Sequence, residues 1–185
     1  MKKMATELEG VYILEPRVFE DSRGYFMETY NEELFKSLGL DLTFVQDNQS
    51  LSTEVGTLRG LHYQLKGKAQ TKVVRCLAGA IFDVAVDIRK GSPTFGSWVG
   101  VELSAKNKRQ LVVPRGFAHG FCTLLPDTVV TYKVDNLYSP SHDRGIAWDD
   151  SEIGVQWPVA QPLLSDKDKR HPTLKQADND FVYGG

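Results

Sequence analysis

Short segments in which apolar and polar residues alternate recur along most of the chain, and glycine or proline separates them. In 81–88 the even-numbered residues are apolar and share one face of an extended chain, whereas Asp83 and Asp87 share the other. We expect the apolar face to be core and the other face to meet ligand or solvent. Residues 72–77 form the preceding candidate strand, and Ala78-Gly79 between the two suits a tight hairpin. With further strands expected at 98–103, 110–113, 121–124 and 129–134, the pattern predicts an all-β sandwich or barrel.

Helix signals are few, and they predict only short helices beside the barrel. Asn31 can cap a helix whose first turn carries two glutamates, with Lys36 near its end and Gly39 as its terminator. Ser165 is a candidate start for one more helix, in a tail that is rich in proline, glycine and charge from Trp148 onward.

The length and composition favour a single domain over 1–185 and exclude several classes of protein. A chain of 185 residues that is 41% hydrophobic can bury a core of its own. A formal net charge of -2 excludes the global basic field that drives non-specific binding to nucleic acid. No run has the pattern of a signal peptide or a membrane-spanning helix, so we expect a cytoplasmic protein without membrane contact. Cys76 and Cys122 lie in apolar runs and are expected to be buried thiols.

Two histidines stand in a frame that resembles the metal site of the cupin superfamily. The string Pro114-Arg115-Gly116-Phe117-Ala118-His119 resembles the second cupin motif. In metal-binding cupins the first motif supplies two histidines one residue apart, and a carboxylate with six residues between it and a glycine. Here that motif starts at His62, and Gln64 takes the place of the second histidine. Lys72, with six residues between it and Gly79, takes the place of the carboxylate, and an ammonium would repel a divalent cation. We therefore expect a pocket that has no metal ligand set.

Polar residues gather between Gln46 and Lys72, near strand-like sequence, where they are costly to bury unless they have partners. A solvated loop explains Gln46-Asp47-Asn48 about as well as a site does, but it explains Arg59 and His62 less well. These strings resemble the dTDP-4-dehydrorhamnose 3,5-epimerase family, metal-free cupins of deoxysugar biosynthesis. The resemblance covers nearly the whole chain, and its most specific strings are Arg23-Gly24-Tyr25-Phe26-x-Glu28, Gln46-Asp47-Asn48, Arg59-Gly60-Leu61-His62-Tyr63-Gln64 and Pro114-Arg115-Gly116-Phe117-Ala118-His119-Gly120-Phe121.

The resemblance implies a cupin-type jelly-roll β-barrel with a few short peripheral helices, and an isomerase activity. The expected reaction inverts C3 and C5 of dTDP-4-dehydro-6-deoxy-D-glucose and gives dTDP-4-dehydro-L-rhamnose, by deprotonation and reprotonation and with no cofactor. Each inversion needs a base on one face of the sugar, an acid on the other, and a group that holds the enolate.

By this resemblance the catalytic residues are His62, Asp168, Tyr132 and Lys72. His62 is the candidate base, because a neutral imidazole accepts a proton near physiological pH. Asp168 would form a dyad with it, although Ser165-Asp166-Lys167-Asp168 is also typical of a capping box. Tyr132 would be the acid, and Lys72 would place positive charge beside the enolate oxygen. The alternatives are a structural barrel tyrosine and an exposed strand lysine.

The resemblance also assigns substrate contacts and predicts a homodimer in which two of them, Arg23 and Glu28, reach across the interface. The full set is Arg23, Glu28, Gln46, Asp47, Asn48, Arg59, Lys72, His119, Tyr138, Asp143 and Lys167. Arginine suits a bidentate grip on diphosphate oxygens. Asp143 stands where the family commonly has glutamate, so its carboxylate is shorter by one methylene. Asp83 has two interpretations: it orients a site residue, or it pairs with Arg75 across the expected hairpin.

The sequence leaves other functions open. Relatives that epimerise one carbon, or that move the ketone between C3 and C4, would share the barrel and the nucleotide contacts. A metal-dependent cupin oxygenase or isomerase would use His62, Gln64 and His119 as ligands, and Lys72 counts against it. A non-catalytic module that binds sugar nucleotides would use His62 and Tyr132 only to line its cavity.

Overall fold

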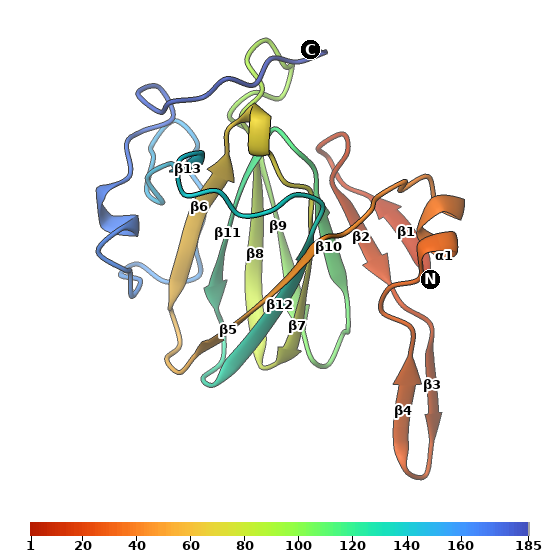
Figure 1. Cartoon of the computed structure of the whole chain (residues 1–185). Helices are drawn as coiled ribbons and strands as arrows, with labels where there is room; N and C mark the ends of the chain where they lie inside the picture. Colours follow the sequence, from red (N-terminus) through yellow and green to blue (C-terminus); the bar gives the residue numbers. More distant parts are fainter. Residues whose placement is uncertain (185) are drawn as a thin grey trace.

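Two antiparallel sheets face each other and close a jelly-roll barrel, from which one hairpin extends (Figure 1). The computed structural model describes residues 1–184, so that Gly185 lies outside the described residues. The first sheet has the order β1 (Lys2–Ala5), β2 (Tyr12–Glu15), β10 (Gln110–Val113), β7 (Lys72–Ala78), β12 (Thr128–Val134) and β5 (Gln46–Ser52). The second has the order β13 (Asp143–Gly145), β6 (Leu58–Gln64), β11 (Phe117–Thr123), β8 (Ala80–Asp87) and β9 (Trp98–Ser104). The hairpin consists of β3 (Val18–Asp21) and β4 (Gly24–Met27). The all-β prediction is confirmed.

Alternation along the strands places one row of side chains between the sheets and the other row outside. Branched aliphatic and aromatic residues fill the space between the sheets, among them Val74, Leu111, Val130, Ile81, Val101 and Phe121. The outer face of the second sheet is apolar as well, and the tail covers it with Ile146, Leu174 and Phe181. Both cysteines are buried free thiols, as predicted. The tail, blue in Figure 1, therefore belongs to the packed structure although it has little regular secondary structure.

The predicted hairpin at Ala78-Gly79 is wrong. β7 pairs with β10 and β12, and β8 pairs with β9 and β11, so the chain crosses from one sheet to the other at this turn. Gly79 has a φ of +75°, and a Cβ there would lie 2.2 Å from the Thr128 Oγ1. Only glycine fits this crossover. The chain does turn at Gly79 as predicted, but the residues of a turn do not determine which sheet the next strand joins.

Both faces of β8 are buried or nearly so, so the expectation that the row with Asp83 and Asp87 meets solvent is wrong. Its even-numbered residues from Val84 on pack under the tail, and the opposite row faces the barrel interior. Asp87 is fully buried and accepts hydrogen bonds from Arg89 and Ser92. Asp83 on this row bonds to His119, which lines the cavity described below. The remaining predicted strands correspond to β7, β9, β10, β12 and the end of β11.

The helix predicted from Asn31 is confirmed as α1 (Glu32–Ser37). The Asn31 side chain accepts a hydrogen bond from the Leu34 N–H at 3.0 Å, and Phe35 packs on the outer face of the first sheet. The helix expected from Ser165 is wrong in extent, because only the single 3-10 turn η2 (Asp168–Arg170) forms; a second such turn, η1, spans Lys66–Lys68. Within residues 1–184, no helix is long and apolar enough to cross a membrane.

Candidate active site

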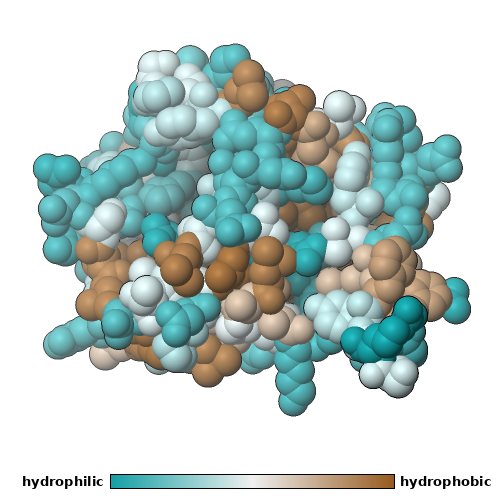
Figure 2. Space-filling view, turned by 60° about the horizontal axis from the view of Figure 1, so that its bottom comes forward, coloured by the Kyte–Doolittle hydropathy of each residue, from teal (hydrophilic) through white to brown (hydrophobic). Residues whose placement is uncertain are grey.

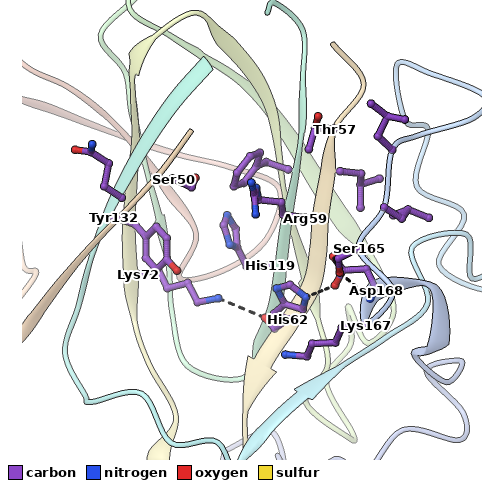
Figure 3. Close-up of a pocket in the computed structure, with 15 residues that line it drawn as sticks. Ser50, Thr57, Arg59, His62, Lys72, His119, Tyr132, Ser165, Lys167 and Asp168 are labelled. Carbon is purple, nitrogen blue, oxygen red and sulfur yellow. Dashed lines mark hydrogen bonds and ion pairs between the residues drawn. The ribbon is translucent and has the colours of Figure 1, made fainter. Parts of the chain in front are cut away.

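A cavity of about 460 Å³ lies inside the barrel, a volume typical of pockets that hold small ligands. Its polar lining includes Arg59, His62, Lys72, His119, Tyr132, Ser165, Lys167 and Asp168. Figure 3 shows Lys72 and Tyr132 on one side of the cavity and His62 with Asp168 on the other. The structure thus brings together the four residues that were predicted to be catalytic, from three strands and the tail.

Two glycines place Arg59 and His62 in the same cavity. Strict alternation would send side chains three positions apart to opposite faces of β6. The register between β6 and β11 shifts here, and a Cβ on Gly60 would lie 2.5 Å from the Gly120 Cα. Because neither residue has a side chain, the two backbones can approach this closely. Both polar side chains therefore line the interior.

His62 and Asp168 form a tightly bonded pair at the cavity wall. The His62 Nε2 lies 2.5 Å from the Asp168 Oδ1, and the Ser165 hydroxyl donates to the Asp168 Oδ2 at 2.8 Å. Burial alone would raise the pKa of Asp168, but the hydrogen bonds from His62 and Ser165 outweigh burial and hold the pKa below its ordinary value. The Asp168 backbone N–H also donates to the Ser165 Oγ at 3.1 Å. The dyad and the capping interaction therefore coexist.

Lys72 extends from β7 into the cavity, and its Nζ donates to the backbone carbonyl of His62 at 3.4 Å. Burial lowers the pKa of Lys72 to about 8, although Asp83 and Asp143 oppose the shift. With that value the ammonium outnumbers the amine roughly tenfold at pH 7. An anionic group that enters the cavity therefore meets a positive charge, and a metal ion beside His62 and His119 would be repelled.

Tyr132 lies on β12, where it is opposite Asn48 of β5 and Val74 of β7. Its phenol lines the cavity on the same side as Lys72 (Figure 3). Burial raises the pKa of Tyr132, so the phenol is protonated at neutral pH. A proton acceptor and a proton donor therefore face each other across the cavity.

His119 and Asp83 form a second, deeper pair. The His119 Nε2 lies 2.8 Å from the Asp83 Oδ1, and both side chains are buried. Burial lowers the pKa of His119 against the opposing effect of Asp83, so this imidazole is neutral at neutral pH. Asp83 therefore orients a residue of the cavity. The alternative contact with Arg75 is wrong, because Arg75 is in the other sheet, opposite Gln110 and Thr131.

A smaller cavity of about 170 Å³ adjoins the first and contains Tyr138 and Asp143. The two cavities share His62, Lys72, Tyr132 and Lys167. The Asp143 Oδ2 accepts hydrogen bonds from the Tyr138 hydroxyl at 3.0 Å and from the Lys167 ammonium. The shortened carboxylate thus ties together two other candidate substrate contacts.

Gln64 lines the smaller cavity, but its amide is engaged by backbone groups. The Oε1 accepts from the Ser139 N–H at 2.6 Å, and the Nε2 donates to the Lys68 carbonyl at 2.6 Å. The Gln64 Oε1 thus fixes the backbone at Ser139. This engagement counts against Gln64 as the second ligand of a metal site.

Gln46, Asp47 and Asn48 lie on β5, and their side chains point to alternating faces of this strand. Gln46 and Asn48 are on the inner face, where the Gln46 Nε2 donates to the Asn48 Oδ1 at 2.8 Å and the Gln46 Oε1 accepts from the Tyr138 N–H at 3.0 Å. Asp47 is on the outer face and pairs with Lys133 at 2.9 Å. The segment is a strand, so the interpretation as a solvated loop is wrong. Asp47 is not in the cavity of its own chain.

Arg23 and Glu28 also lie away from the cavity of their own chain. Arg23 is at the tip of the β3–β4 hairpin, where its side chain is 86% exposed and pairs with Asp21. The Glu28 Oε1 accepts a hydrogen bond from the Asn31 side chain at 3.1 Å. The end of the molecule from which the hairpin extends shows apolar residues exposed among polar ones (Figure 2). The exposed aromatic residues of the hairpin are Phe19, Tyr25 and Phe26.

The sequence reasoning missed His171 as a neighbour of the dyad. Its Nε2 lies 3.4 Å from the Asp168 Oδ1, and its ring meets the His62 ring edge-on at 5.5 Å between centroids. Burial, with His62 beside it, lowers the pKa of His171. The spacing of three residues from Asp168 is the one signal that the sequence offers for this contact. The tail reaches the cavity because Leu163 bridges to Thr57, which no local pattern predicts.

The chain is similar in sequence and in structure to epimerases of dTDP-linked sugars. The family model described as dTDP-4-dehydrorhamnose 3,5-epimerase matches residues 5–176. The dTDP-4-dehydrorhamnose 3,5-epimerase of Shigella flexneri is 56% identical over 179 residues, which are 96% of this chain and 98% of that protein. The crystal structure of the enzyme of that name from Bacillus anthracis str. Ames, with TDP and PPi bound, has a TM-score of 0.91 and 55% identity and covers 93% of this chain and 98% of its own.

A third relative was solved with a sugar nucleotide. The dTDP-6-deoxy-D-glucose-3,5-epimerase of Legionella pneumophila Philadelphia 1, in complex with dTDP-4-keto-L-rhamnose, has a TM-score of 0.91 and 44% identity. The match covers 95% of this chain and 93% of that one. The likeness therefore extends over the barrel, the hairpin and most of the tail.

Proposed function

The chain belongs to the dTDP-4-dehydrorhamnose 3,5-epimerase family, and we propose that it inverts C3 and C5 of dTDP-4-dehydro-6-deoxy-D-glucose to give dTDP-4-dehydro-L-rhamnose. The observation that carries the proposal is the His62–Asp168 pair, which faces Lys72 and Tyr132 across one cavity. C3 and C5 both flank the C4 ketone, so loss of a proton from either carbon gives an enolate. The reaction needs a base, an acid and a cation, and residues of all three kinds line this cavity.

His62 removes the proton in this proposal. Its Nε2 is bonded to the Asp168 Oδ1, so Nδ1 is the ring nitrogen left to accept a proton. Asp168 is an anion whose pKa is held low, and it stabilises the imidazolium that forms. Ser165 keeps the carboxylate in place from the other side.

Tyr132 and Lys72 complete the reaction from the opposite wall. The Lys72 ammonium holds the enolate oxygen as negative charge develops there. The Tyr132 phenol, protonated because burial raises its pKa, returns a proton to the other face of the sugar. No step requires a redox or Lewis-acid group, so we predict activity without a cofactor.

The nucleotide half of the substrate would bind to the polar residues around the two cavities. Arg59 and Lys167 are the cations suited to diphosphate, and Tyr138 offers an exposed ring to the base. Arg23 and Glu28 would reach the site of a second chain, which makes the protein a homodimer in this proposal. The exposed aromatic residues of the hairpin that carries Arg23 support such a contact.

We infer that the protein works in the cytoplasm on a dTDP-linked 4-keto-6-deoxy sugar. Both cysteines are buried as free thiols, the form that a reducing compartment favours. The relative from Legionella pneumophila was solved with a dTDP-linked keto sugar, which supports the substrate class.

Proton NMR of the substrate with the enzyme in heavy water tests the double inversion. Deuterium should appear at both C3 and C5, because each carbon exchanges its proton with solvent through an enolate. Deuterium at one carbon alone would make the protein a single-carbon epimerase. Appearance of a 3-keto product would identify a ketoisomerase.

Two variants test whether the protein is an enzyme or a non-catalytic module that binds sugar nucleotides. His62→Ala and Tyr132→Phe should bind dTDP as the wild type does and lose at least about a hundredfold in turnover. His142→Ala, which changes a histidine bonded to Ser139 outside the two cavities, is the matched control and should keep full turnover. Full turnover in the first two variants would contradict the catalytic roles.

A further inference from the structure

We propose that His62, Asp168 and His171 form a binding site for Zn²⁺ that arrests catalysis by occupying the base. The His62 Nε2, one Asp168 oxygen and one His171 ring nitrogen all lie within 4.8 Å of one another. Two imidazoles and one carboxylate are a zinc ligand set that leaves a fourth position for water. Zinc binding does not depend on the proposed function, whereas the loss of turnover rests on the proposed role of His62.

The distances suit a zinc ion after a small adjustment. Ligand atoms about 2.0–2.1 Å from a tetrahedral zinc lie roughly 3.3 Å from one another. The His171 Nε2 is already 3.4 Å from the Asp168 Oδ1. The His62 Nε2 is 2.5 Å from the same oxygen, so zinc would take the place of the proton between them and move them slightly apart.

His171 is the residue that distinguishes this cluster from an ordinary dyad. Its side chain is nine-tenths buried, and its Nε2 has no hydrogen-bond partner within residues 1–184. A buried ring nitrogen without a partner is costly, and that cost is removed when it binds a cation. The ring lies against Gly145, where a Cβ would be 2.4 Å from it, so the backbone of β13 makes room for this position.

The charges near the cluster permit a dication. Asp168 supplies a carboxylate that is ionised at neutral pH, and both histidines can bind zinc through a neutral ring. Lys167, which precedes Asp168 in the chain, is paired with Asp143, which offsets its positive charge. The Lys72 Nζ approaches the His62 backbone carbonyl to 3.4 Å, but it does so from the side of His62 opposite Asp168 (Figure 3). The side that carries the Asp168 carboxylate is therefore the one where a cation is favoured.

Zinc at this position would disable the base without filling the substrate cavity. Metal on the His62 Nε2 displaces the proton there, and the neutral ring then carries its proton on Nδ1. Nδ1 is the nitrogen that would accept the substrate proton. Zinc should therefore lower kcat and leave KM and dTDP affinity unchanged.

Isothermal titration with ZnCl₂ alone tests the binding site. The wild type should take up one zinc per protomer. His171→Asn should weaken zinc binding by at least about tenfold, since loss of an outer-shell partner alone costs about that much. His142→Asn, which removes a histidine elsewhere, should bind zinc as the wild type does. No uptake by the wild type, or equal affinity in His171→Asn, would overturn the proposal.

Two further measurements test the zinc site without the His171→Asn variant. Gly145→Ala keeps all the histidines but pushes the His171 ring away, and it should weaken zinc binding as His171→Asn does. Anomalous diffraction at the zinc edge from wild-type crystals soaked in ZnCl₂ should place one peak between the three side chains. A peak that lacks His171 as a ligand contradicts the site. A rise in KM at constant kcat would contradict the arrest of the base.

Discussion

The two oxygens of the Asp168 carboxylate have different partners, and this division links the chemistry to the local fold. Oδ1 is bonded to His62, and Oδ2 accepts from Ser165, which in turn accepts from the Asp168 backbone. The capping pattern in the sequence pointed to the second contact, and the family resemblance to the first. One side chain satisfies both, because the short turn η2 directs it into the barrel.

Lys72→Met should lower kcat roughly a hundred- to thousandfold and leave dTDP affinity unchanged, because it removes the charge that holds the enolate. Steady-state kinetics and dTDP titration measure the two quantities. Lys133→Met, on the outer face of the same sheet, is the control and should keep its turnover. Weaker binding with normal turnover would instead make Lys72 a diphosphate contact.

The activity should decline above about pH 8 because the Lys72 ammonium, whose pKa burial lowers to about 8, is the acid form that works. A lowered lysine pKa means that the proton is lost at a lower pH than in the unfolded chain. Tyr132 shifts in the opposite direction and stays protonated through this range. The pH profile of kcat/KM should therefore fall about tenfold per unit above that value. If the same fall persists in Lys72→Met, another group causes it.

At the scale of elements, periodicity predicted strands well and their partners poorly. β10 was predicted with its observed bounds, because Gln110–Val113 is a short apolar run between turn residues. The hairpin of β7 and β8 failed, because the crossover at Gly79 has the local sequence of a tight turn. β5 was not predicted as a strand, because its sequence is largely polar and has little apolar alternation. The position of the irregular tail was not predicted either, because it depends on the bridge between Leu163 and Thr57, which are far apart in the sequence.

The close approach of β6 and β11 should make Gly120 intolerant of a side chain. A Cβ there would lie 2.9 Å from the Arg59 carbonyl oxygen and 3.0 Å from the Gly60 Cα, and both are backbone atoms. Gly120→Ala should lower the free energy of unfolding by about 1–3 kcal/mol in urea titrations. Gly67→Ala, whose nearest neighbour would be 3.7 Å away on a side chain, should change it little. Equal stability of the two variants would contradict this account.

At the scale of the whole molecule, a single domain over 1–185 and a homodimer both stay predictions, and mixing two inactive variants tests the dimer. Arg23→Ala keeps the cavity of its own chain, and His62→Ala keeps its hairpin. If the hairpin completes the neighbouring site, a mixed dimer holds one site with both residues intact. Mixing the variants under exchange conditions should restore part of the turnover, and light scattering should give twice the chain mass. Failure to recover activity in confirmed mixed dimers would contradict a shared site.

The segment that precedes Asp168 of the dyad has few buried side chains. From residue 154 to residue 167 no residue is fully buried. Val155 and Trp157 pack at the edge of the core under the tail, and beyond them Leu163 joins the barrel through backbone bonds to Gly56 and Leu58. Such a stretch can detach locally while the sheets stay intact. Inactivation in urea should therefore precede the loss of the β-sheet circular dichroism signal. The urea concentration that abolishes activity would then be lower than the concentration that unfolds the β-sheets.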